Sequence, residues 1–101
     1  MKFNIFWTPI GLASLKESKK FILKHWNEKV LEHFLNLVDK RIEQLLSNPE
    51  LAPRVEFTQY RKLLIHKNIS IFDTLDSELI KVLLVWDNRQ DPKELQDRLK
   101  S

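Results

Sequence analysis

Residues 60–72 read YRKLLIHKNISIF, and residues 85–92, near the other end of the chain, read VWDNRQDP. The first stretch sets cationic side chains among apolar ones, and the second places Arg89 just past a very apolar run. Burial in a sheet normally excludes charged side chains unless a partner compensates them. Cations retained in such sequence therefore indicate that an anionic partner meets them.

The sequence favours β-structure from Val55 onward. Three runs of strand length lie at Val55–His66, Ile69–Leu75 and Leu79–Trp86. The short polar breaks at residues 67–68 and 76–77 suit tight hairpin turns, because Asn and Asp tolerate left-handed backbone angles. We therefore expect an antiparallel meander. The third run is apolar at nearly every position, which predicts a central strand covered on both faces.

The N-terminal half favours helices. Residues 3–7, FNIFW, predict a short strand, after which Thr8 offers an N-cap hydroxyl and Pro9 a preset first helical position. Asn27 can cap a second helix, and the residues Ser47-Asn48-Pro49 end it. Two helices joined by almost no loop must run antiparallel. Apolar residues at helical spacing mark their buried sides: Leu12, Leu15, Ile22 and Trp26 in the first, and Leu31, Leu35, Val38, Ile42 and Leu45 in the second.

A last short helix follows Asp91, because Asp91-Pro92-Lys93-Glu94 combines an N-cap, a first-turn proline and an acidic residue suited to the helix N-terminus. The predicted order is β-α-α-β-β-β-α. This is an α+β fold, with an antiparallel sheet packed against an N-terminal αα-hairpin. We expect residues 1–101 to form a single domain, since no linker or repeat interrupts the 101-residue chain.

Composition narrows the class of protein. The chain is 43% hydrophobic and 31% charged and has no cysteine, so it can form neither a disulfide nor a thiolate metal site. The longest apolar run, Val82–Trp86, is too short to span a bilayer, and the first residues lack the apolar core of a signal peptide. We therefore expect a cytoplasmic protein without a membrane partner.

The net charge of +3 is distributed unevenly. Residues 54–67 hold four basic side chains and one acidic side chain, whereas residues 68–101 hold five basic and seven acidic ones. The middle segment is basic, yet less so than the binding face of a typical duplex-DNA binder. A small or shape-specific anionic target fits this distribution better.

Four short stretches, in this order and spacing, resemble the RelE/ParE superfamily of bacterial toxins over nearly the whole chain. They are Trp7-Thr8-Pro9, Leu45-Leu46-Ser47-Asn48-Pro49, Tyr60-Arg61-Lys62 and Trp86-Asp87-Asn88-Arg89. The resemblance implies a growth-inhibiting toxin of a type II toxin-antitoxin system, of the kind associated with plasmid stabilization. It also implies a cognate antitoxin protein as partner.

The superfamily has two activities, which make different chemical demands. RelE-like members cut mRNA on the ribosome, which requires a proton acceptor, a proton donor and cations around the phosphate. If the chain is such an endoribonuclease, Arg61 and Arg89 would hold charge and His66 would move protons. Two features depart from that pattern: Asp73 stands where the family often has tyrosine, and residues 90–101 contain neither tyrosine nor histidine.

ParE-like members bind DNA gyrase and break no bond, and the long second helix together with the two departures favours this branch. The residues expected to bind the target are Arg61, Lys62, Lys67, Arg89 and Gln90. A third possibility is an inactive family member that serves as an antitoxin-binding module.

Each candidate residue also has a purely structural interpretation. Arg61 can pair with Asp73 or Asp87, and Arg89 with Asp87 or Asp91. His66 can be a solvated residue at a strand end, and the lysines at 16, 19, 20 and 24 a solvated helix face. The three tryptophans are most simply core or half-buried packing residues. We expect no metal site and no cofactor, because the histidines lie far apart in sequence and no acidic residue stands at a characteristic ligand spacing.

Overall fold

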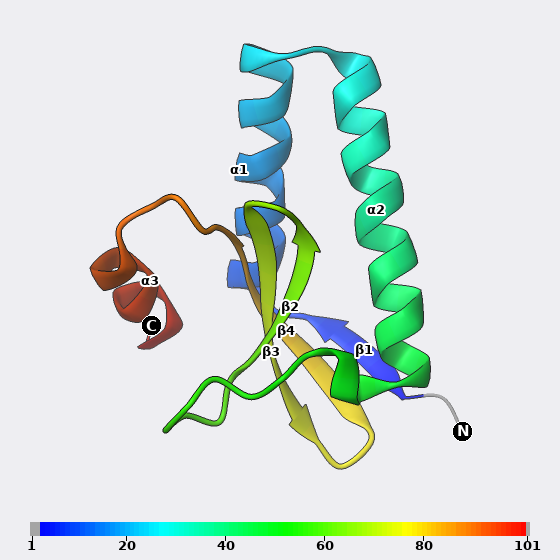
Figure 1. Ribbon diagram of the computed structural model, residues 1–101, viewed down its shortest axis with the longest axis vertical. Helices are drawn as coiled ribbons and strands as arrows, with labels where there is room; N and C mark the ends of the chain where they lie inside the picture. The colour runs from blue at the N-terminus through cyan, green and yellow to red at the C-terminus, as the bar shows by residue number, and fades with distance from the viewer. Residues whose placement is uncertain (1–2, 101) are drawn as a thin grey trace.

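The computed structural model describes residues 3–100 and shows an α+β fold in the predicted order (Figure 1). One 3₁₀ turn, η1, is added after the second helix. The elements are β1 (Asn4–Trp7), α1 (Pro9–His25), α2 (Glu28–Ser47), η1 (Pro49–Leu51), β2 (Arg61–His66), β3 (Ile69–Asp76), β4 (Leu79–Asp87) and α3 (Pro92–Lys100).

The four strands form one sheet in the order β1-β4-β3-β2. The meander β2-β3-β4 is antiparallel, as predicted, but β1 runs parallel to β4, so the sheet is mixed. Parallel neighbours need a long crossover connection, and the αα-hairpin and the meander separate β1 from β4 in the chain. The prediction that β4 is an interior strand is confirmed, because it lies between β1 and β3.

The strand predicted from Val55 begins only at Arg61. Of residues 52–60, only Pro53 and Arg54 lie against β2, joined to it by an isolated bridge between Arg54 and Arg61 and by a hydrogen bond from the Lys62 N–H to the Pro53 carbonyl, 3.0 Å. Residues 55–60 form a turn, in which the Val55 N–H donates to the Tyr60 carbonyl at 2.8 Å. A tight turn at Phe57, whose φ is 64°, breaks the extended backbone there.

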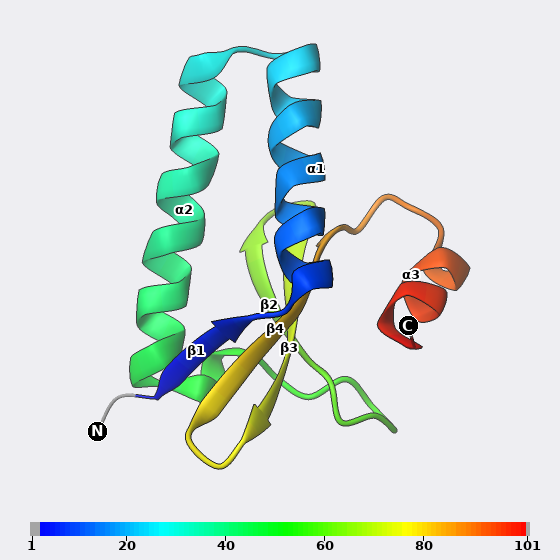
Figure 2. The same cartoon turned by 180° about the vertical axis from the view of Figure 1, so that it is seen from behind.

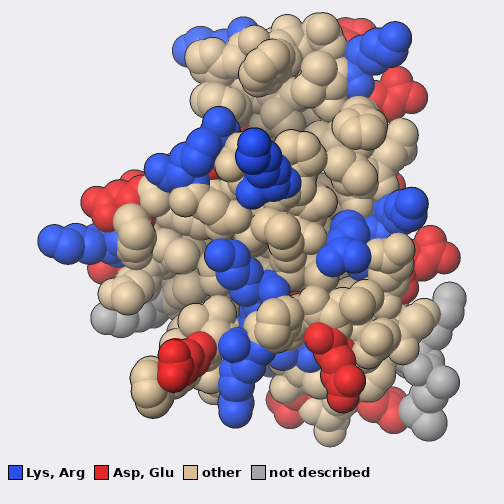
Figure 3. All heavy atoms as spheres, viewed as in Figure 1, with Lys and Arg blue, Asp and Glu red and all other residues tan. Residues whose placement is uncertain are grey.

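Figure 3 shows Lys and Arg side chains along the middle of the face that Figure 1 presents.

Both helices of the hairpin begin where their caps predict. The Thr8 hydroxyl accepts a hydrogen bond from the Gly11 N–H at 3.0 Å, and the Asn27 side chain accepts one from the Val30 N–H at 2.9 Å. Each cap satisfies a backbone donor that the first turn of a helix leaves free. Figures 1 and 2 show the two helices side by side, extending well beyond one end of the sheet.

An irregularity in β4 receives the N-terminal half of α1. The pairing of β3 with β4 shifts between Phe72↔Leu84 and Asp73↔Val82, so Leu83 is a bulge. The Val82 carbonyl accepts hydrogen bonds from the Thr8 hydroxyl (2.8 Å) and from the Thr8 N–H (3.1 Å). Beyond the bulge, the Val85 N–H donates to the Ser14 hydroxyl at 2.8 Å, which itself donates to the Gly11 carbonyl at 2.7 Å.

The approach of α1 to β4 requires glycine at position 11. A Cβ there would lie 2.5 Å from the Val82 carbonyl oxygen, a backbone atom that cannot turn away. Thr8, Gly11 and Ser14 recur at three-residue intervals and so share one face of α1. We call these three residues and the β4 backbone that they contact the α1–β4 seam.

The sheet carries a core on each face. Under the hairpin, apolar side chains of α1, α2 and all four strands pack together, among them Phe34, Leu63, Ile71 and Val82. On the other face, Phe72, Leu84 and Trp86 are covered by Leu95 and Leu99 of α3. The Tyr60 hydroxyl fixes α3 further by donating to the Leu99 carbonyl at 3.2 Å.

Replacing Gly11 with alanine tests the α1–β4 seam. Alanine favours helix by about 1 kcal/mol over glycine, so a site with room would be stabilised. The clash with the Val82 carbonyl predicts the opposite, a loss of about 1–3 kcal/mol in the free energy of unfolding, measured by urea denaturation. Ala13→Gly, at an exposed position of the same helix, measures the difference in helix propensity between alanine and glycine where no clash contributes. A stabilised Gly11→Ala variant would contradict the seam.

Candidate binding cleft

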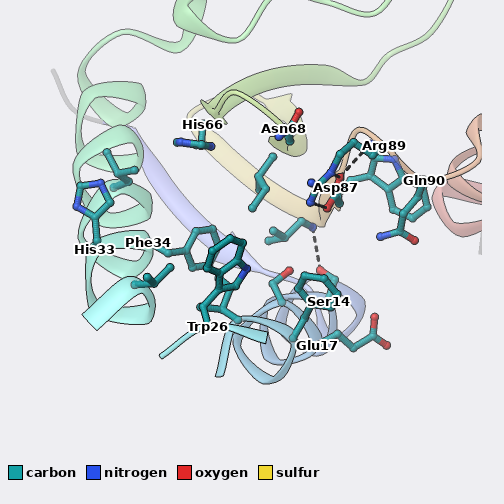
Figure 4. A pocket seen from close by; sticks show the side chains of 18 of the residues that line it. Ser14, Glu17, Trp26, His33, Phe34, His66, Asn68, Asp87, Arg89 and Gln90 are labelled. Atoms are coloured by element: carbon teal, nitrogen blue, oxygen red, sulfur yellow. Dashed lines mark hydrogen bonds and ion pairs between the residues drawn. The ribbon is translucent and has the colours of Figure 1, made fainter. Parts of the chain in front are cut away.

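A cleft of about 770 Å³ opens between the distal half of the αα-hairpin and the end of the sheet. Its walls come from α1, α2, the turn between β2 and β3 and the segment that follows β4, as Figure 4 shows. The cleft exists because the distal part of the hairpin extends beyond one end of the sheet (Figures 1 and 2).

Apolar side chains form much of this surface. Ile22, Phe34 and Val85 are buried core residues that also line the cleft. At the rim, Trp26 is 66% exposed and Phe21 is 49% exposed, with the His25 ring 4.4 Å from that of Phe21. Large exposed aromatic side chains beside an apolar hollow are typical of a protein interaction site.

The charged groups of the cleft are paired. The Arg89 guanidinium donates to both carboxylate oxygens of Asp87, at 3.0 Å from Nε and 2.7 Å from a terminal nitrogen. This interaction lowers the pKa of Asp87 and raises the pKa of Arg89. Arg98 of α3 lies 3.2 Å from a Glu17 carboxylate oxygen and 3.6 Å from one of Glu94. Among the Asp, Glu, Lys and Arg side chains that line the cleft, two carboxylates balance two guanidiniums.

The structure brings three of the predicted site residues together, and these are His66, Arg89 and Gln90, which line the cleft. Lys67 is exposed in the turn after β2, next to them in space, because the Asn88 N–H donates to the Asn68 carbonyl at 2.6 Å. Lys62 is not part of the cleft; its Nζ lies 6.0 Å from the centre of the Phe72 ring.

Arg61 also lies outside the cleft, in the interior of the protein. Its Nε donates to an Asp73 carboxylate oxygen at 2.8 Å, and the two side chains are only 12% and 0% exposed. Alternation along β2 places Arg61 on the same face as the buried Leu63 and Ile65, and Asp73 is its direct partner on β3. Of the two carboxylates considered for Arg61 in the sequence, Asp73 is the one that it meets.

The Arg61–Asp73 pair is incompletely satisfied. One terminal nitrogen of Arg61 and the second oxygen of Asp73 are buried without a hydrogen-bond partner in the described chain. Burial raises the pKa of Asp73 above its usual range, and the hydrogen bond and charge of Arg61 oppose that effect only in part. Arg61, which is predicted from the sequence to bind the target, is therefore bound to Asp73 inside the protein.

The helical side of the cleft was not predicted from the sequence. Trp26 was expected to pack in or near the core and is mostly exposed, and His33 was assigned no role although it lines the cleft. Helical periodicity marks which side of a helix is apolar but not where the sheet beneath it ends.

Among residues 3–99, whose side chains are described, no cluster of three or more His, Asp or Glu side chains is arranged to hold a metal ion. No helix in the described part of the chain is both long and apolar enough to cross a membrane.

Solved structures with the same fold include toxin-antitoxin proteins. A structure of the chromosomal ParDE toxin-antitoxin system from P. aeruginosa superimposes with a TM-score of 0.72 at 15% identity, over 85% of this chain and 96% of that one. The RelBE2 complex from Mycobacterium tuberculosis gives 0.61 at 12% identity over 86% and 99%. The YoeB dimer from Staphylococcus aureus gives 0.54 at 18% identity over 81% and 92%. No curated protein matches the chain in a sequence comparison.

The chain thus shares its fold with these toxin-antitoxin proteins. Residues 5–92 match the family described as the ParE toxin of the type II toxin-antitoxin system parDE. The chain belongs to this family.

A double-mutant cycle tests whether Arg61 serves the fold. Arg61→Met or Asp73→Leu alone leaves a buried charge unpaired and should cost about 3–5 kcal/mol of unfolding free energy. The double variant Arg61→Met/Asp73→Leu should recover most of that loss, because apolar residues of similar size replace a buried ion pair well. Unfolding in urea measures all four proteins.

Arg89→Met is the matched control, since it breaks the exposed pair with Asp87 and should cost less than about 1 kcal/mol. Losses at Arg61 and Asp73 that simply add, or an Arg61→Met variant as stable as the parent, would show that the pair is not structural.

Proposed function

We propose that the chain is a toxin that stops bacterial growth by binding DNA gyrase, and that a cognate antitoxin holds it inactive by occupying the cleft. Membership in the ParE toxin family supports the first half of this proposal. The apolar lining of the cleft supports the second. The chain would be a binding protein and not an enzyme.

The observation that carries the proposal is the burial of Arg61 against Asp73. RNA cleavage places extra negative charge on a phosphate, and cations must contact that phosphate in the transition state. A guanidinium that is 12% exposed and bound to a carboxylate cannot do so without breaking a core ion pair. The two arginines of the cleft are paired as well, so the cleft presents no excess of positive charge.

The target-binding surface that we propose consists of Lys67, Arg89 and Gln90, with Lys62 further along β2. The first three lie on two neighbouring segments, because a hydrogen bond joins Asn68 to Asn88. The Asn88 amide also donates to the buried Ser70 hydroxyl at 2.9 Å, which fixes the second segment on the sheet. A fixed array of one ammonium, one guanidinium and one amide suits recognition of a polar protein surface.

The antitoxin segment that suits the cleft is amphipathic. Its apolar side would cover Phe21, Trp26 and Phe34, and its polar side would face solvent near the paired charges of the rim. A volume of about 770 Å³ holds several large side chains of a helix or extended strand. Solved structures with this fold from M. tuberculosis and E. coli are toxin-antitoxin complexes, which supports a protein partner of this kind.

A ribosome-dependent endoribonuclease is the second candidate, and one observation favours it. His66 and Arg89 line the same cleft, so a proton carrier and a cation lie near one another. The pairing of Arg89 with Asp87 reduces the charge that this arginine can offer to a phosphate.

Induced expression in bacteria separates the two candidates. We expect growth arrest with DNA-damage signalling and loss of supercoiling by gyrase, while RNA 5′-end mapping finds transcripts intact. The same loss of supercoiling should occur with purified gyrase and the purified chain. Codon-phased mRNA cuts with unaffected gyrase would reverse the assignment, and expression without any effect on growth would indicate an antitoxin-binding module.

Variants locate the surface in the same assay. Arg89→Ala combined with Gln90→Ala should raise the concentration needed to inhibit gyrase by roughly tenfold or more, the effect of about 1.4 kcal/mol of lost contact. His66→Ala should leave inhibition unchanged, because binding needs no proton transfer. Lys93→Ala, an exposed charge on α3, is the control for a change of net charge.

Trp26→Ala tests the role of the cleft. A rim tryptophan buried by a partner typically contributes 2 kcal/mol or more, so antitoxin affinity should fall by about 30-fold or more. Gyrase inhibition by the free chain should not change. Titration calorimetry with the antitoxin measures the first effect, and Leu64→Ala, an exposed apolar residue of β2 outside the cleft, is the control. Unchanged antitoxin affinity in Trp26→Ala would place the antitoxin elsewhere.

A further inference from the structure

The αα-hairpin has a second exposed face on the side of the helices opposite to the cleft. On α1, helical spacing places Leu12, Lys16, Lys19 and Leu23 along it. On α2, the matching residues lie around a shallow hollow that Leu23 also lines: Glu28, Leu31, Glu32, Leu35 and Asp39. We call this surface the outer face.

Charge is segregated across the outer face. The α1 side is basic, with Lys16 and Lys19, and the α2 side is acidic, with Glu28, Glu32 and Asp39. Within residues 3–99 none of these five side chains forms an ion pair. The opposite charges therefore remain available for a partner that carries the same two rows in reversed positions.

A second copy of this chain is such a partner. We propose that two copies pair through their outer faces, related by a two-fold axis that runs parallel to the hairpin. This rotation keeps each residue at its height along the hairpin and exchanges the two sides, so that α1 of one copy faces α2 of the other. Twofold pairs of this kind use one self-complementary patch on both subunits.

The heights of the charged residues fit this arrangement. Lys16 lies nine residues before His25, the last residue of α1, and Asp39 lies eleven residues after Glu28, the first of α2. Their distances from the connection therefore differ by only about 3 Å at 1.5 Å per residue. Lys16 of each copy then meets Asp39 of the other, and each ion pair occurs twice.

The charges also exclude the other simple two-fold arrangement. An axis across the hairpin would set α1 against α1 and α2 against α2, with lysine facing lysine and carboxylate facing carboxylate. Like charges opposed in an interface cost several kcal/mol. The segregation of charge thus selects the axis as well as the partner.

Apolar contact supplies the attraction that ion pairs alone do not. Leu12 and Leu23 are 46% and 47% exposed, and Leu31 and Leu35 are partly exposed between the charged rows. Two adjacent helices of about 25 Å, each about 10 Å wide, present a face of roughly 500 Å² in projection, at the lower end of what each partner of a specific interface buries. The cleft lies on the opposite side and stays open in the dimer.

Sedimentation velocity of the purified chain, made by cell-free synthesis, tests the dimer. We expect a concentration-dependent monomer–dimer equilibrium. Lys16→Glu and Asp39→Lys should each raise the dissociation constant by at least about tenfold, because each sets like charges together twice. An equimolar mixture of these two variants should form a heterodimer, since both contacts between positions 16 and 39 are then complementary, and the double variant Lys16→Glu/Asp39→Lys should dimerise alone.

Lys24→Glu is the matched control, with the same charge change on the same helix at a position off the outer face. Circular dichroism and thermal unfolding verify that every variant is folded. A chain that stays monomeric up to about 0.1 mM, well above the range of specific interfaces of this size, would overturn the proposal. A dimer that neither single reversal weakens, or that mixing fails to restore, would overturn it too.

Discussion

The seating of α1 on the bulge of β4 is the constraint on which the rest of the structure depends. A bulge leaves backbone groups without ladder partners, and the α1–β4 seam supplies partners from one helix face: Thr8 binds the Val82 carbonyl and Ser14 receives the Val85 N–H. Glycine between them permits the close approach. Because the seam holds only the first half of α1, the second half and the connected part of α2 project beyond the sheet, and that projection creates the cleft.

The second constraint is the use of Arg61 by the fold. A buried ion pair contributes little net stability compared with apolar packing, but losing one partner is costly because the other charge remains buried. Asp73 therefore ties Arg61 to the interior of the sheet. A residue that resembles a catalytic cation in sequence is in this way withdrawn from the surface, and Arg89 lines a cleft in which it is paired with Asp87. Binding to a protein target requires no excess of positive charge in the cleft, whereas cleavage of RNA requires cations that contact the phosphate.

Much of the fold could be predicted from the sequence because its signals are local. The caps at Thr8 and Asn27, the stop at Pro49 and the alternation of the meander each depend on a few neighbouring residues, and the structure confirms the order of elements that they predict. The resemblance to RelE/ParE toxins depended on the same kind of short stretches, and the match over residues 5–92 bears it out.

The remaining features depend on contacts between distant segments. The parallel pairing of β1 with β4 and the bulge at Leu83 follow from how α1 sits on the sheet, which no single stretch specifies. Trp26 is exposed because the hairpin extends beyond the end of the sheet. Arg61 is buried because Asp73 lies directly opposite it on β3. The sequence indicates two carboxylates that could pair with Arg61, Asp73 and Asp87, but only the register between β2 and β3 shows that the partner is Asp73.

The state of the Arg61 side chain in solution tests most directly whether the chain acts by binding and not by cleavage. NMR of the arginine Nε–H groups distinguishes Arg61, hydrogen-bonded and buried, from Arg89, whose side chain is 63% exposed. The Arg61 Nε–H should exchange slowly with water and should not shift when a short oligoribonucleotide is added. An Arg61 signal that exchanges as fast as that of Arg89 and moves on addition of RNA would contradict the account.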